Sequence, residues 1–141
     1  MTFEIGSVNW LAVATVAGAT FMLGGLWYTA LFGKAWARLC GYSDEKLAQM
    51  RKDRPPPVFF SVMLLSYLVL AGVMAVLVQA CAITTWSGGA MLGAVVWAGP
   101  VAAVMLSNHI ASDRPFAAYA IDAGFALVHL PLGGAILGAW R

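Results

Sequence analysis

An acidic side chain inside an apolar segment is the first feature of this sequence that could do chemistry. Asp122 is the only Asp, Glu, Lys or Arg within residues 116–140. A carboxyl group at membrane depth costs about 2.5–3.5 kcal/mol on insertion scales, so such a group is normally paired or functional. His129 follows seven residues later, about two turns along the same helix face. These two residue types could carry a proton or a cation between them.

Three further polar residues, Asn108, His109 and Tyr119, fall toward the same end of the apolar segments as Asp122. They are the other candidates for a ligand or proton site. Two interpretations stay open. In the functional one, Asp122 and His129 form a proton or cation relay. In the structural one, Asp122 is hydrogen-bonded to the preceding helix or paired with a basic group such as His109, and His129 is a core residue.

Known signatures of catalysis and cofactor binding do not occur in the sequence. It has no metal-ligand spacing, no nucleophile beside a base, no phosphate-binding glycine loop and no dinucleotide fingerprint. Cys40 and Cys81 are predicted to lie on opposite sides of a bilayer, too far apart for a disulfide. We therefore expect no catalytic residue, no metal and no cofactor, which favours a protein that is not an enzyme.

The composition places these residues in a membrane. Hydrophobic residues make up 62% of the 141 residues, charged residues only 10%, and the mean hydropathy is +0.83. Soluble domains are about half apolar and a quarter charged, so an ordinary soluble enzyme, a nucleic-acid-binding domain and a disordered tail are excluded. The expected surrounding is a lipid bilayer, and nucleic acid is not an expected partner.

Four apolar stretches are each long enough to cross about 30 Å of hydrocarbon as a helix. They are residues 8–28, 58–82, 87–110 and 116–140. Strands would need an alternating pattern, which is absent, so the expected fold is all-α: a single domain, residues 1–141, with four transmembrane helices in a bundle. We expect Ser7 to cap the first helix.

The loop between the first two helices, residues 33–57, holds most of the charge. Gly41 predicts a helix end there, and Ser43 predicts the cap of a short amphipathic helix on the membrane surface over residues 44–51. Six of the eight Lys and Arg residues lie in this loop, and a seventh, Arg114, lies in the link between the last two helices. The positive-inside rule makes that side cytoplasmic and both termini, with Arg141, periplasmic. The basic cluster could bind anionic lipid, or it could only fix the topology.

Small residues recur at helical spacing on the last two predicted helices. They are Ala90, Ala94, Ala98 and Ala102 on the third helix, and Gly124, Gly134 and Gly138 on the fourth. Such stripes allow membrane helices to approach closely. We expect them to pack helices within one chain, with enough small surface left to support a homodimer or another homo-oligomer.

Two parts of the chain carry a family resemblance. The first contains GGLWY at residues 24–28 and LFGKAW at residues 31–36, and the second contains IDAGF at residues 121–125 and GAILGAW at residues 134–140. With these motifs the chain resembles a family of small bacterial membrane proteins that is catalogued as a domain of unknown function. The resemblance spans essentially the whole chain. It implies four helices and a bacterial inner-membrane location, and it implies no activity.

These features favour a small binding or transport module with a polar site inside the membrane near Asp122 and His129. The alternative is a structural or accessory membrane protein that transports nothing, and a membrane-embedded enzyme ranks third. Four helices enclose little interior space, so oligomerisation around a cavity would favour transport.

Overall fold

The structure, a computed structural model, describes residues 3–140. Most of this part of the chain is helical, and no strand occurs within it. The helices are α1 (Trp10–Leu26), α2 (Gly33–Leu39), α3 (Asp44–Asp53), α4 (Pro56–Ala80), α5 (Trp86–Val96), α6 (Ala102–Ala111) and α7 (Phe116–Ala139). A 3₁₀ turn, Ile5–Ser7, precedes α1, and two π-helical turns, Trp27–Leu31 and Trp97–Val101, follow α1 and α5. The predicted all-α fold is confirmed.

Four helical segments are long and apolar enough to cross a membrane. They are Trp10–Leu31, Pro56–Ala80, Trp86–Ala111 and Phe116–Ala139. The first joins α1 to its π turn, and the third joins α5 to α6 through the second π turn. The four predicted spans are therefore confirmed, with ends shifted by at most three residues. The chain is a multi-pass membrane protein.

Local capping chemistry explains where several helices begin. Asn9, rather than the expected Ser7, caps α1, because Asn9 Oδ1 accepts a hydrogen bond of 3.1 Å from the amide of Ala12. Ser43 caps α3 as predicted: its Oγ accepts a hydrogen bond from the amide of Lys46 at 3.1 Å. Gly41, with a φ of 73°, turns the chain after α2 as expected. The predicted amphipathic helix is α3, which extends to Asp53 and has no buried residue.

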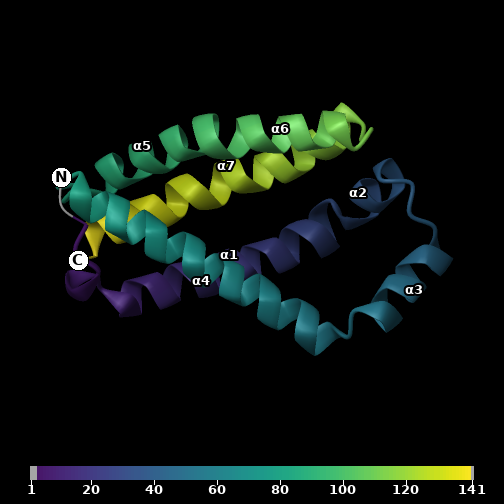
Figure 1. The fold of residues 1–141 in the computed structure, drawn as a ribbon, viewed down its shortest axis with the longest axis horizontal. Helices are drawn as coiled ribbons and strands as arrows, with labels where there is room; N and C mark the ends of the chain where they lie inside the picture. The colour runs from purple at the N-terminus through teal and green to yellow at the C-terminus, as the bar shows by residue number, and fades with distance from the viewer. Residues whose placement is uncertain (1–2, 141) are drawn as a thin grey trace.

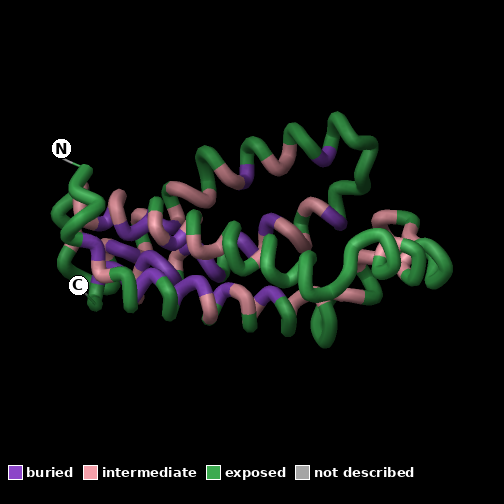
Figure 2. The backbone as a smooth tube through the Cα atoms, turned by 60° about the horizontal axis from the view of Figure 1, so that its bottom comes forward, coloured by how far each residue is buried: buried purple, intermediate pink, exposed green. Residues whose placement is uncertain are grey.

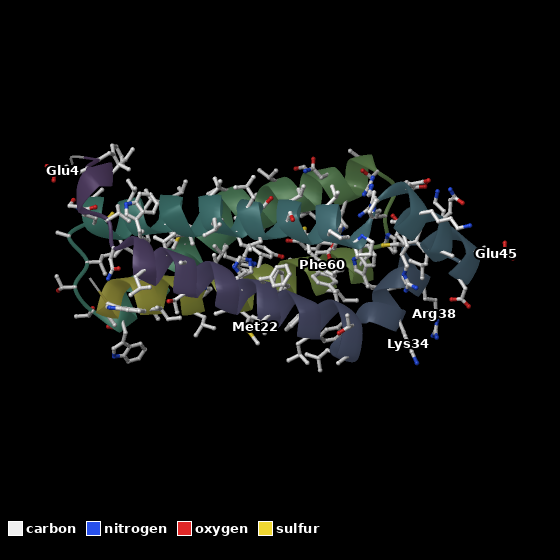
Figure 3. The ribbon with its side chains drawn as sticks, turned by 90° about the horizontal axis from the view of Figure 1, so that it is seen from below. Glu4, Met22, Lys34, Arg38, Glu45 and Phe60 are labelled. Carbon is white, nitrogen blue, oxygen red and sulfur yellow. The ribbon has the colours of Figure 1, made fainter. Side chains whose placement is uncertain are left out.

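The helices form two antiparallel hairpins that lie side by side (Figure 1). One hairpin pairs α1 with α4, and the other pairs α5 and α6 with α7. Both ends of the described chain lie at one end of the bundle, called the terminal end below. The opposite end, called the loop end, holds α2, α3 and the link from α6 to α7. Glu4 lies at the terminal end, whereas Lys34, Arg38 and Glu45 lie at the loop end (Figure 3).

The closest helix contact joins α5 to α7 through glycines. A Cβ placed on Gly89 would collide with the carbonyl group of Gly134, one on Gly93 with that of Leu130, and one on Gly138 with that of Thr85. The backbones of the two helices thus touch directly, which only glycine permits.

The predicted alanine stripe of the third span lies beside this contact. Ala90 and Ala94 are half-buried, Ala98 is exposed, and Ala102 is buried. On α7, Gly134 and Gly138 pack in the contact as expected, and Gly124 packs against the Trp27 ring. The contact between α5 and α7 therefore runs along Gly89 and Gly93, which each lie one residue before an alanine of the stripe.

Buried residues concentrate toward the terminal end (Figure 2). Residues of α1, α4 and α7 form one apolar core there, including Ala12, Val13, Met74 and Leu130. The half of α4 nearer the loop end is different, because residues 56–66 are exposed apart from Met63, which is half-buried. This half of α4 diverges from α6 and α7 toward the loop end (Figure 1).

Candidate functional site

The carboxyl group of Asp122 joins three helical segments near the loop end. The hydroxyl of Tyr28, in the first π turn, donates a hydrogen bond of 2.6 Å to Asp122 Oδ1. The Nε2 atom of His109, on α6, lies 3.1 Å from Asp122 Oδ2. The side chains of His109 and Asp122 are 9% and 13% exposed, respectively. The expected polar partner of Asp122 is thus His109, together with a tyrosine from the other hairpin.

The hydrogen bonds of His109 limit where the hydrogens on its ring can lie. Its Nδ1 lies 2.9 Å from the carbonyl oxygen of Met105. Because a carbonyl can only accept, Nδ1 carries a hydrogen and donates. The hydrogen between Nε2 and Asp122 Oδ2 then belongs either to an imidazolium or to a carboxylic acid. In both states, one hydrogen lies between these two atoms.

Two tryptophans hold the backbone of α7 on either side of Asp122. Trp27 Nε1 donates a hydrogen bond of 3.1 Å to the carbonyl of Ile121, and Trp97 Nε1 donates one of 2.8 Å to the carbonyl of Ala123. Each tryptophan is the first residue of a π turn. π turns inside α-helices are frequent at functional sites. Here they accompany the two indoles that fix the position of the carboxyl group.

The other candidates on α6 and α7 occupy different surroundings. Tyr119 lies edge-on against His109, with ring centroids 5.6 Å apart, and its hydroxyl donates a hydrogen bond of 3.2 Å to the carbonyl of Ala102. Asn108 is exposed. The structure therefore brings His109, Tyr119 and Asp122 together and directs Asn108 away from them.

His129 does not contact Asp122. It is buried two turns farther toward the terminal end, and the ring of Phe125 lies between them along α7. The Phe125 centroid is 4.6 Å from that of His129 and 5.6 Å from that of Tyr28. The predicted relay partners share a helix face, as expected from their spacing, but an aromatic ring separates them.

The loop end of the site is covered by α2 and the residues that follow it. Trp36 lies edge-on against Tyr28, with ring centroids 6.0 Å apart, and its buried Nε1 has no hydrogen-bond partner among residues 3–140. Cys40 lies close enough to Arg114 and Asp122 to interact electrostatically with both side chains. Burial raises the pKa of the Cys40 thiol; Arg114 opposes this shift and Asp122 adds to it. The site thus lies just beneath a partly covered surface.

A metal ion is not an evident occupant. Among the described residues, no group of three or more His, Cys, Asp and Glu side chains is placed to hold one. The contacts that the structure gives the Asp122 carboxyl group are those with Tyr28 and His109.

Sequence reasoning missed Tyr28, Trp27 and Trp97 as members of the site. Tyr28 lies 94 residues from Asp122, so no local spacing connects them. A signal was present nonetheless, because the motifs GGLWY and IDAGF, which carry the family resemblance, meet in space at this contact.

Comparisons with known proteins identify a family and supply no activity. A family model described as "Protein of unknown function (DUF1761)" matches residues 11–138. No curated protein and no solved structure matches the chain.

Proposed function

Since the chain belongs to the DUF1761 family, whose function is unknown, we propose from the geometry at Asp122 that it is a small proton-binding and transport module of the membrane. In this proposal, the His109–Asp122 pair takes up and releases one proton at Nε2 and Oδ2. The observation that carries it is the bond from His109 Nδ1 to the Met105 carbonyl. Because Nδ1 is already engaged, the proton of the pair lies between Nε2 and Asp122 Oδ2.

The surroundings support exchange of this proton with the loop end. The pair lies close to the end of the bundle and keeps slight exposure, at 9% and 13% of the side chains. Tyr28 holds Oδ1, so release of the proton leaves a carboxylate with a hydrogen-bond donor still in place. Ionisable groups inside membrane segments mark proton pathways in many transporters.

Proton binding is tested on purified protein by infrared spectroscopy. The carboxylic acid and carboxylate bands of Asp122 should interconvert as the pH is changed, and this change should be absent in Asp122→Asn. Asp53→Asn, an exposed carboxylate of α3, is the matched control and should retain it. Transport is tested in liposomes that carry a pH gradient and a trapped pH dye. The wild type and Asp53→Asn should dissipate the gradient faster than Asp122→Asn does.

A second candidate function is a structural or accessory protein that transports nothing. It is favoured by the same contacts, because one carboxyl group on α7 connects the first π turn to α6 through Tyr28 and His109. This candidate expects no titrating carboxyl band and a proton flux equal to that of empty liposomes. Those two results together would replace the proton-binding proposal.

We further propose that the protein lies in a bacterial inner membrane, with its loop end cytoplasmic and both termini periplasmic. Seven basic residues support this orientation at the loop end: Lys34, Arg38, Lys46, Arg51, Lys52, Arg54 and Arg114. The eighth, Arg141, lies outside the described residues. A periplasm-active reporter fused to the C-terminus should be active, and one inserted within α3 should be inactive. The reverse result would overturn the orientation.

Two partners belong to the same proposal. Anionic lipid headgroups fit the basic residues of α2 and α3, which are exposed. A second copy of the chain fits the exposed apolar half of α4, whose residues 56–66 pack on little else in this chain. Binding to vesicles with and without anionic lipid tests the first partner, and native mass spectrometry from detergent tests the second.

A further inference from the structure

Two buried polar side chains in the middle of the bundle lack a protein partner. Thr20 on α1 is 6% exposed, and His129 on α7 is 8% exposed. Neither makes a hydrogen bond to another side chain or backbone group within residues 3–140. Thr15 and Thr29 on the same span behave differently, because their hydroxyls donate to the carbonyls of Leu11 and Gly25. The Thr20 hydroxyl has not taken this usual helical partner.

These two side chains face the same small hollows. One hollow has a volume of about 10 Å³ and reaches Tyr67 and Met74 on α4. A second hollow of about 10 Å³ reaches Leu23 on α1 and Ile136 on α7. Both are bordered by Thr20 and His129. The unpartnered groups and the empty spaces therefore coincide.

Each hollow reaches the lower limit of the space that one water molecule needs, and each is bordered by at least two polar residues. A water needs roughly 10–15 Å³ of such space and two to four polar partners, and dry cavities are apolar. A buried hydroxyl or imidazole without a partner costs about 1–3 kcal/mol. Water in these hollows removes that cost, because it can donate to one group and accept from the other.

We propose that Thr20 and His129 bind ordered water, one molecule in each hollow, at the centre of the membrane-spanning bundle. Tyr67 also lies on the border of the first hollow. Phe125 packs against His129 on the side of Asp122, at 4.6 Å between centroids, and separates the water site from the proton site. The water site is independent of the proposed proton exchange. A negative result for one of the two proposals therefore does not contradict the other.

The chain suits a direct measurement, since it contains only two histidines. Protein with ¹⁵N-labelled histidine, reconstituted in a lipid bilayer, gives two sets of ring signals, which a His109→Gln variant assigns. Water-edited solid-state NMR then reports which ring receives magnetisation from water. In the wild type, His129 should receive it despite its depth.

Three substitutions on α1 complete the test. Thr20→Val keeps the shape but removes the hydroxyl, so transfer to His129 should fall. Thr20→Ser restores a hydroxyl and should restore transfer. Thr15→Val removes a hydroxyl that bonds its own helix on the exposed side, so it should leave transfer unchanged. Absence of transfer to His129 in the wild type, or equal transfer in Thr20→Val and Thr15→Val, would overturn the water site.

Discussion

Truncation of Asp122 provides the sharpest test of the contacts around it. Asp122→Ala removes the acceptor of the Tyr28 hydroxyl at 2.6 Å and the partner of His109 Nε2 at 3.1 Å. Asp122→Asn is the matched comparison. Its amide oxygen can accept from Tyr28, and its amide nitrogen can donate to Nε2 of a neutral imidazole, so both bonds persist without a titrating group.

The size of the effect follows from the two lost bonds. A buried partner left unsatisfied costs about 1–3 kcal/mol in soluble proteins, whereas hydrogen bonds between membrane helices average about 0.6 kcal/mol and reach about 1.7. The membrane values apply here, because both bonds join helical segments that span the membrane. For two bonds, the loss in Asp122→Ala is about 1–3 kcal/mol, or roughly 5- to 150-fold in the folding equilibrium. Asp122→Asn should lose less than about 0.5 kcal/mol.

The free energy of unfolding in mixed micelles measures both variants against the wild type at one pH. The expected order is wild type close to Asp122→Asn, with Asp122→Ala clearly less stable. Equal destabilisation by Asn and Ala would refute the reasoning, because it would mean that the negative charge itself is required. The pair would then be a permanent ion pair rather than a group that exchanges its proton.

Two further predictions concern packing and reactivity. Gly89→Ala should destabilise the α5–α7 contact by about 1–3 kcal/mol, since the added methyl group collides with the Gly134 carbonyl. Ala98→Leu, on the exposed side of the same span, should change the unfolding free energy little, and equal losses would place the contact elsewhere. In single-cysteine variants, maleimide should modify Cys40 more slowly than the exposed Cys81 at pH 7, because burial raises the Cys40 pKa and reduces its thiolate fraction. The Cys40 rate should continue to rise with pH above about 8.5, the ordinary thiol value, and equal rates at pH 7 would contradict the burial.

Local chemistry made much of the fold predictable. Apolar length defined the four spans, and the Ser43 hydroxyl and the left-handed Gly41 marked the short helix in the loop. The prediction of Ser7 as the cap of α1 was wrong, because Asn9, an equally good capping residue two positions later, takes that role. Such features depend on a few neighbouring residues, which is why a single sequence reveals them.

Contacts between distant helices were less accessible. Gly89 and Gly93 are offset by one residue from Ala90 and Ala94, about 100° around the helix, and both series have the same spacing. Which series forms the contact depends on the position of α7, and α7 packs on the glycines. In the same way, Asp122 and His129 share a face, yet the bulk of Phe125 between them keeps them apart.

The π turn at Trp97–Val101 determines which polar residue of α6 reaches Asp122. Gly93 and Trp97 face α7, and an uninterrupted α-helix returns to the same face about eleven residues after Trp97, at Asn108. A π turn holds one residue more than an α turn, so the face advances by one position and His109 occupies it instead. The π turn therefore accommodates one inserted residue while the same side of the helix continues to face α7. Differences of one residue in length between related chains are expected to fall inside this turn, where they leave the histidine in register with the carboxyl group.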